Sequence, residues 1–387
     1  MQGIFLYDTD VTVKGTGSLT ADTSAVAGYG PAPFSVMAGK DTNPATRTGH
    51  FTQEGGNITV KANPKDPAIC LSVSNDLTIR GGSLTTEGAT YGMVCSKGTL
   101  SIEGGKVICR GFSGDGISNY KGDILISGQD TSVAVYTAEK DAYSFGIMAE
   151  PDPDSQLPSG NIMISGGNVH IEAGQVGIYT ESGEVGIFGG TVYTKAENQT
   201  GSGDAVGIYS TGNLSVTGGE VFACGMGEGV SGVGLYSETA LSVSGGAVTA
   251  QGTEQAVSPA PDFSSYPGAV VYAAADFEGT QPEEYQENNL AGYRYFSIHG
   301  PQFSLRFENG AAVITAPYST DAEVLFAAYD QTGTLTALER KKAVLTPGEN
   351  RILPELFQPE QGSTVKVMLW DSAGGMKPLC AAENGTV

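Results

Sequence analysis

The sequence predicts an all-β chain, with a right-handed parallel β-helix of about nine coils followed by a small antiparallel β-sandwich. The β-helix is predicted from a Gly-Gly step that recurs roughly every 25 residues, and from short apolar runs with period-2 alternation on either side of it. A unit of this length cannot enclose a core by itself, whereas stacked units can. The steps are Gly55-Gly56, Gly81-Gly82, Gly104-Gly105, Gly166-Gly167, Gly189-Gly190, Gly218-Gly219 and Gly245-Gly246.

Each predicted coil contains three short strands, and helical periodicity is absent from the pattern. The first strand precedes the Gly-Gly step, the second follows it, and the third comes after a loop of variable length. One coil shows this order in Leu214–Val216, Val221-Phe222 and Val233–Leu235. The high glycine content, 56 of 387 residues, agrees with this fold because glycine accepts the left-handed backbone of tight corners.

The repeat weakens near residue 255, and we interpret residues 255–299 as the last coil and its cap. A cap is expected because the final coil would otherwise expose its core and unpaired strand edges. From residue 300 to 387 the strands are longer and are separated by hairpin signals such as Asn309-Gly310 and Pro347-Gly348. The sequence therefore predicts a β-helix domain over residues 1–299 and an Ig/fibronectin-like β-sandwich over residues 300–387.

The formal net charge of −22 restricts the partners that the chain can bind. Nucleic acid is excluded because phosphate binding needs a basic surface, and an anionic membrane surface is disfavoured for the same reason. The apolar runs are shorter than the roughly 18 residues that a membrane span needs, so we expect no direct membrane insertion. Strand-like sequence follows Met1 almost at once. We therefore expect a chain without its targeting and anchoring segments, located outside the cell or on its surface.

The five cysteines lack the paired spacing of a zinc site, and each lies in an apolar run, so we predict small buried side chains. A disulfide between Cys70 and Cys95 stays open, because these residues lie on neighbouring coils. The cysteines are Cys70, Cys95, Cys109, Cys224 and Cys380.

Two parts of the sequence resemble known families. The repeated pattern of Leu-x-Ile, Gly-Gly-x-Val and Gly-Ile resembles bacterial carbohydrate-binding β-helix proteins with a pectate-lyase-like fold, which implies polysaccharide binding and an association with calcium. The segment Val365–Ser372, followed by Met376–Leu379, resembles the closing strand of accessory β-sandwich domains in clostridial and related Gram-positive secreted proteins. This second resemblance implies a surface or secreted protein.

A column of tyrosines is the first candidate binding surface. In the third strand of each coil the residue after glycine is apolar and should point inward, so the next residue should point outward. The outward column contains Val94, Ser118, Met148, Tyr179, Tyr209 and Tyr236. Coils stack about 4.8 Å apart, close to the length of one sugar in an extended chain, so Tyr179, Tyr209 and Tyr236, with Met148, could follow a glycan. Alternatively, the rings only stabilise the sheet.

A second outward aromatic set follows the Gly-Gly corner on three adjacent coils and consists of His170, Tyr193 and Phe222. The same two interpretations apply, and we predict that His170 is a member of this stack rather than a catalyst. Tyr193 and Phe222 are expected to pack face to face even without a ligand.

Acidic residues in the loops before the third strand provide candidate ligands for calcium, the one cofactor considered. Carboxylates stacked on adjacent coils repel unless they are separated, hydrogen-bonded or bridged by a hard cation. The candidates are Asp115, Asp141 and Asp204, and solvated turn-capping acids are the alternative interpretation.

The sequence contains few candidates for a set of catalytic residues. A lyase needs a cationic base beside an acidic cluster, and a hydrolase needs carboxylates at a defined separation. The local candidates are Arg110 with Asp115 and Lys140 with Asp141. We therefore expect a secreted or cell-surface, non-catalytic carbohydrate-binding or adhesive protein that presents its β-helix to a polysaccharide. A β-helix polysaccharide lyase or glycoside hydrolase, and a structural stalk without a ligand, are the alternatives.

Overall fold

The computed structural model describes residues 3–25, 32–37, 48–64, 69–88, 90–137, 144–151, 158–199, 202–266, 268–300, 303–316, 320–346, 348–371, 378–380 and 382–386. The chain divides into two compact units. The first contains residues 1–266 and 271–299, and the second contains residues 267–270 and 300–387. In the described residues, no helix is both long and apolar enough to cross a bilayer.

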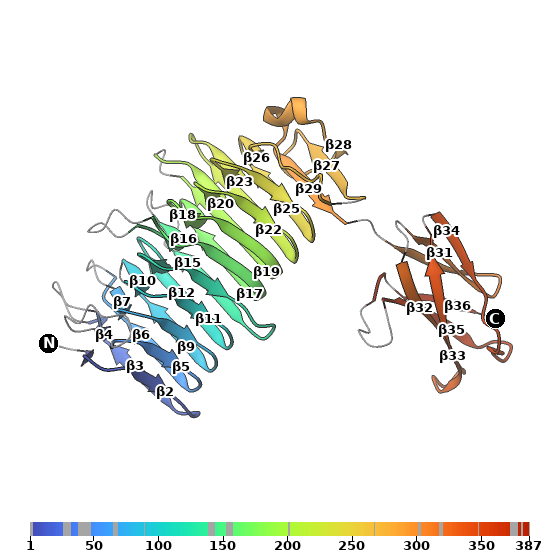
Figure 1. Ribbon diagram of the computed structural model, residues 1–387, viewed down its shortest axis with the longest axis horizontal. Helices are drawn as coiled ribbons and strands as arrows, with labels where there is room; N and C mark the ends of the chain where they lie inside the picture. Colours follow the sequence, from blue (N-terminus) through green and yellow to red (C-terminus); the bar gives the residue numbers. More distant parts are fainter. Residues whose placement is uncertain are drawn as a thin grey trace. The chain divides into compact units, whose positions relative to one another are not determined.

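The first unit is a parallel β-solenoid of about 8 turns, which confirms the predicted fold class with slightly fewer coils than expected (Figure 1). The third strands of successive coils form one sheet of 10 strands. In chain order and in sheet order these are β1 (Ile4–Tyr7), β4 (Phe34–Met37), β7 (Ile69–Val73), β10 (Tyr91–Cys95), β13 (Ile117–Asn119), β16 (Phe145–Ala149), β18 (Val176–Thr180), β20 (Ala205–Ser210), β23 (Gly232–Ser237) and β26 (Gln255–Ser258).

The first and second strands of the coils belong to one larger sheet. In two neighbouring coils they merge across the Gly-Gly corner into single strands, β17 (Ile162–Ala173) and β19 (Val185–Asn198). The other first strands are β2 (Val11–Val13), β5 (Phe51–Gln53), β8 (Leu77–Ile79), β11 (Leu100–Ile102), β14 (Ile124–Ile126), β21 (Leu214–Val216) and β24 (Leu241–Val243). The other second strands are β3 (Ser18–Asp22), β6 (Asn57–Lys61), β9 (Ser83–Glu87), β12 (Lys106–Phe112), β15 (Ser132–Thr137), β22 (Glu220–Gly227) and β25 (Ala247–Gly252).

The solenoid core consists of columns of inward-facing aliphatic side chains. In the first strands, Leu77, Leu100 and Ile124 are fully buried and are paired in register. Polar residues occupy one inner corner, at the ends of the third strands. There the hydroxyls of Thr180, Ser210 and Ser237 donate hydrogen bonds to backbone carbonyls in the turn of the preceding coil, and those of Ser210 and Ser237 also bond to the turn of their own coil. These hydroxyls therefore provide hydrogen-bond partners for backbone carbonyls of the turns at this corner.

The predicted Gly-Gly corners have the expected backbone. The second glycine of every step has a positive φ, for example 77° at Gly82 and 81° at Gly219, which a residue with a Cβ adopts only with strain. The repeat of glycine at this position therefore follows from the backbone conformation of the corner.

The last coil is closed by a segment that runs against the direction of the repeat. It contains β27 (Val270–Ala274), β28 (Glu283–Glu284), the 3-10 helix η1 (Glu287–Gly292) and β29 (Tyr295–His299). Strand β29 pairs antiparallel with β25, and Tyr293 and Phe296 are fully buried. These contacts cover both the edge and the core of the final coil.

The second unit contains a three-stranded and a four-stranded antiparallel sheet, as the predicted β-sandwich requires. The smaller sheet contains β30 (Ser304–Glu308), β31 (Ala311–Ala316) and β34 (Gly348–Ile352). The larger contains β33 (Leu335–Leu345), β32 (Thr320–Tyr329), β35 (Thr364–Trp370) and β36 (Glu383–Thr386). Ile314 from one sheet and Val324, Phe326 and Val367 from the other belong to a single buried cluster.

All five cysteines are free thiols, so the disulfide that the sequence left open is not formed. Cys70, Cys95, Cys109 and Cys224 are buried, as predicted, and Cys380 is half-buried. Burial raises the pKa of the Cys109 thiol to about 12, which keeps it protonated and unreactive.

Candidate functional site

The predicted outward column exists as a register of four strands. Met148 of β16 is aligned with Tyr179 of β18, which is aligned with Tyr209 of β20 and then Tyr236 of β23. The predicted exposure of this column is wrong at its first three positions, because Val94 and Ser118 are fully buried and Met148 is only 8% exposed. The three tyrosines are half-buried, so the column reaches the surface only at them. We call Tyr179, Tyr209 and Tyr236 the tyrosine face.

The rings of the tyrosine face contact one another without lying parallel. The centroids of Tyr179 and Tyr209 are 5.0 Å apart at an interplanar angle of 56°, and those of Tyr209 and Tyr236 are 4.8 Å apart at 87°. An edge-to-face pair covers the face of only one of its two rings, whereas a parallel pair covers one face of each. The tilted arrangement therefore leaves more ring face available to a ligand.

An apolar column supports the tyrosine face from one side. Val176, Val206 and Val233 form a small buried cluster against which the three tyrosines pack. Phe145, which the sequence analysis did not select, extends this row and lies 5.4 Å from Tyr179 in a stacked geometry. The rings are thus held in place by packing in the absence of a ligand.

Carboxylates line the other side of the tyrosine face. Glu150, Glu181 and Glu238 follow their strands two positions after the outward column, and their backbone N–H groups continue the parallel ladder to the preceding coil. Side chains two residues apart in a strand share a face, so these residues lie beside the tyrosines. We call Glu150, Glu181 and Glu238 the carboxylate edge. The sequence analysis missed them, although the period-2 rule could have found them.

Direct interactions join the tyrosine face to the carboxylate edge. The Tyr209 hydroxyl donates a hydrogen bond of 2.5 Å to Oε1 of Glu238. Burial raises the pKa of Tyr179 to about 12, with further contributions from the negative charges of Glu181, Glu238 and Glu150. All three carboxylates therefore act on one phenol, so the two groups form one surface.

Two carboxyl groups near this surface hold their protons unusually strongly. Asp115 precedes β13, is 4% exposed and accepts a 2.5 Å hydrogen bond from the Ser118 hydroxyl. Burial raises its pKa to about 7 in spite of that bond. Burial also raises the pKa of Glu150 to about 8, with added repulsion from Asp115 and Glu181. Asp115 is therefore an enclosed acid rather than the solvated loop residue that one interpretation predicted.

The second aromatic set has a different geometry. The His170 and Tyr193 rings are stacked at 4.6 Å and 6°, and those of Tyr193 and Phe222 at 5.0 Å and 7°. His170 also pairs with Glu172 at 2.9 Å. Because the parallel rings cover each other's faces, this set stabilises the sheet and presents mainly ring edges to solvent.

Of the proposed calcium and catalytic residues, the structure describes Arg110, Asp115 and Asp204, and each of them lies in a different environment. Arg110 places its guanidinium 5.2 Å from the Tyr136 ring, at the end of the second aromatic set, whereas Asp115 is bonded to Ser118. Asp204 is exposed. Lys140 and Asp141 lie outside the described residues. Among the residues that the structure describes, there is no group of three or more side chains suited to a metal ion.

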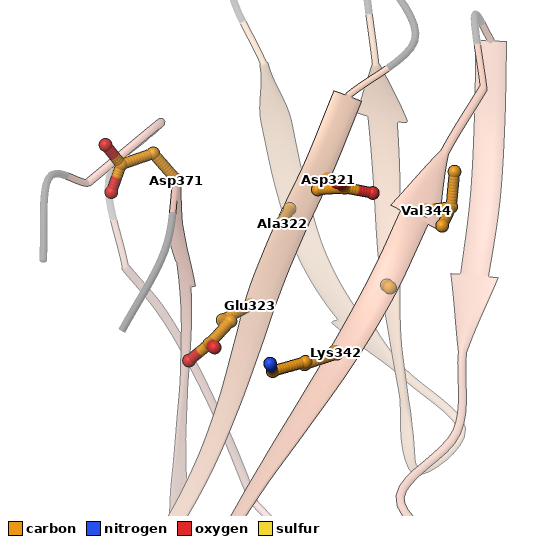
Figure 2. A pocket seen from close by; sticks show the side chains of 7 residues that line it. Asp321, Ala322, Glu323, Lys342, Val344 and Asp371 are labelled. Atoms are coloured by element: carbon orange, nitrogen blue, oxygen red, sulfur yellow. The ribbon is translucent and has the colours of Figure 1, made fainter. Parts of the chain in front are cut away.

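A separate cavity of about 350 Å³ in the β-sandwich is lined by residues of the paired strands β32 and β33 and by Asp371 (Figure 2). Figure 2 shows Lys342 extending from β33 toward Glu323 on β32, and the two residues are directly paired in the sheet. Glu323 is 5% exposed, and its Oε2 lies 3.5 Å from Nε of Arg340. The other residues that line the cavity are Asp321, Ala322, Ala343, Val344 and Asp371.

We expect Arg340→Leu to destabilise the sandwich by about 1–3 kcal/mol, because it leaves the enclosed Glu323 carboxylate without its nearest cation. Urea unfolding followed by fluorescence measures this, since Trp370 is the only tryptophan and lies in β35.

The matched control for this prediction is Arg306→Leu. Arg306 pairs with Glu308 and Glu349 on the exposed surface, where ion pairs contribute little to stability, so the midpoint should stay unchanged. An unchanged midpoint in Arg340→Leu would show that the enclosed Glu323 carboxylate does not depend on Arg340.

The fold and this surface define a class, namely a β-solenoid that presents ordered aromatic side chains along its coils. A family model described as "carbohydrate-binding domain-containing protein" matches residues 37–279, which is more than half of the 387 residues. The chain therefore belongs to this family of carbohydrate-binding domain-containing proteins. The matched range includes the tyrosine face and excludes the sandwich. Searches of curated proteins and of solved structures found no significant match.

Proposed function

We propose that this protein binds an extended polysaccharide without cleaving it, with the sugar chain running along the tyrosine face. The observation that carries the proposal is the alignment of Tyr179, Tyr209 and Tyr236 on three successive coils. Half-buried rings that are held by packing lose little conformational entropy when a ligand binds.

The spacing of the coils supports an extended ligand. Strands in a sheet lie about 4.8 Å apart, so each tyrosine is offset from the next by close to the length of one sugar. Each sugar can therefore meet an equivalent side chain, and the contacts add along the chain. We propose that the protein works outside the cell or on its surface, where polysaccharides of this kind are found.

We expect Tyr209→Ala to weaken polysaccharide binding about tenfold or more, because Tyr209 is the central ring of the tyrosine face. The triple variant Tyr179→Ala/Tyr209→Ala/Tyr236→Ala should abolish binding. Affinity electrophoresis or titration calorimetry against plant, host and microbial polysaccharides, with and without calcium, measures both.

Tyr193→Ala is the matched control, because Tyr193 is also half-buried in a ring stack but lies in the other sheet. It should leave affinity unchanged. Wild-type affinity in a folded triple variant would reject the tyrosine face as the binding surface.

One observation favours a second candidate function, the hydrolysis of glycosides. Such enzymes use a carboxylic acid that stays protonated near neutral pH together with a second carboxylate, and Glu150 and Asp115 have raised pKa values of about 8 and about 7. Release of new reducing ends from a polysaccharide, and its loss in Glu150→Gln, would support hydrolysis over binding alone.

A further inference from the structure

The charges around the tyrosine face restrict the chemistry of its ligand. Neither lysine nor arginine occurs in the strands that build this surface. These strands are β10, β13, β16, β18, β20, β23 and β26. Glu181 and Glu238 are exposed on the carboxylate edge. A uronate or sulfated sugar placed on the tyrosines would therefore meet negative charges without a cation from these strands to offset them.

We infer that the tyrosine face and the carboxylate edge together select a glycan that carries amino groups, such as a β-1,4-linked glucosamine chain, over an acidic polysaccharide. This inference rests on the proposed function. A protonated amine can pair with a carboxylate and can also lie against the face of a tyrosine ring. The site offers both kinds of group within one surface.

The register of the carboxylates fits such a chain. Beside the three tyrosines, Glu181 and Glu238 occupy equivalent positions two coils apart, and Thr211 occupies the intervening coil. Glu150 lies one coil before Glu181, next to the buried Met148 rather than next to a tyrosine. Two coils correspond to about 9.6 Å at the spacing of strands in a sheet. In an extended β-1,4-linked chain, alternate sugars present the same substituent on the same side. Every second amine can therefore meet a carboxylate, and the sugar between them meets a hydroxyl.

The hydrogen bond from Tyr209 to Glu238 gives this arrangement a defined geometry. It holds the Glu238 carboxylate beside the central ring while the second carboxylate oxygen stays available to a ligand. Glu238 is thus positioned before binding, which reduces the entropic cost of pairing with an amine.

Calorimetric titration of the full chain with four hexasaccharides tests the inference. The ligands are the β-1,4 glucosamine hexamer, its N-acetylated form, cellohexaose and hexagalacturonate. They are titrated at a pH at which the amine is protonated and at low salt, because screening weakens exposed pairs. We expect the glucosamine hexamer to bind about tenfold or more tightly than its N-acetylated form, and hexagalacturonate to bind most weakly.

Glu181→Gln/Glu238→Gln should remove the preference for the free amine over the N-acetylated form. The matched control is Glu220→Gln/Glu278→Gln, which removes the same charge from exposed residues of β22 and the cap. This control should keep the preference.

The outcomes separate the inference from the proposed function. Equal or tighter binding of hexagalacturonate, or a preference that persists in Glu181→Gln/Glu238→Gln, overturns the inference alone if Tyr209→Ala still weakens binding. Poly-lysine provides a further test. If it binds as tightly as the glucosamine hexamer and its binding does not depend on Tyr209, the inference is overturned, because positive charge alone would then explain the binding. A complete absence of hexasaccharide binding overturns the inference, and it overturns the proposed function as well if the polysaccharide panel also shows no binding.

Discussion

Gly207→Ala should strongly destabilise the solenoid, although it adds only one methyl group. A Cβ at Gly207 would lie 2.6 Å from the carbonyl oxygen of Gly234, 2.7 Å from the Cys224 nitrogen and 3.0 Å from the Ala223 carbonyl carbon. All three are backbone atoms of the next coil, which cannot rotate away. We therefore expect a loss at or above the upper end of the roughly 1–3 kcal/mol range for overpacking. Urea unfolding followed by circular dichroism measures it.

The control for this substitution is Gly17→Ala. A Cβ at Gly17 meets no atom within 4 Å, and its φ is not positive. The substitution should be neutral or slightly stabilising, since alanine reduces the entropy of the unfolded chain. Equal stability of the two variants would show that the coils can separate at Gly207 with little cost.

The solenoid should lose stability as the pH rises from about 4 to about 8, because of Asp115 and Glu150. Burial raises the pKa of Asp115 to about 7 and that of Glu150 to about 8 in the folded protein. For groups with raised pKa values, the stabilisation is complete below the unfolded values near 4 and is lost as the pH passes the folded values. The enclosed Asp115 alone corresponds to a few kcal/mol at roughly 1.4 kcal/mol per pKa unit.

Asp115→Asn should flatten this pH dependence, because an amide can still accept the Ser118 hydrogen bond but cannot ionise. The measurement is the circular dichroism midpoint at several pH values, with Trp370 fluorescence reporting separately on the sandwich. Asp204→Asn serves as control, because Asp204 is exposed. The same slope in wild type and Asp115→Asn would mean that Asp115 ionises without a penalty in the folded protein.

The fold could be predicted because its determinants are local and repeated. The left-handed corner at residues such as Gly82 requires glycine whatever the rest of the chain does, and the alternation around it assigns each residue to a face. The same two rules placed Tyr179, Tyr209 and Tyr236 in one column, as the register shows.

The remaining features depend on contacts between coils, which the spacing of residues in the sequence does not display. The glycine before the inward residue of each third strand was treated only as a marker, but at Gly207 it is required by the next coil's backbone. Asp115 was a candidate calcium ligand and catalytic residue, with a solvated turn-capping acid as the alternative, and none of these interpretations included its burial. Its 4% exposure depends on the tertiary structure. The ring angles that distinguish Tyr209 from Tyr193 also require coordinates.

The antiparallel pairing of β29 with β25 has a consequence for assembly. A parallel stack of coils could in principle continue from one molecule into the next, because its terminal edge matches the starting edge of another copy. Here the edge of β25 is occupied by a strand of opposite direction, so end-to-end polymerisation through this edge is blocked. The length of the tyrosine face in one molecule is therefore set by the number of its own coils, and lengthening this face requires inserting further repeats.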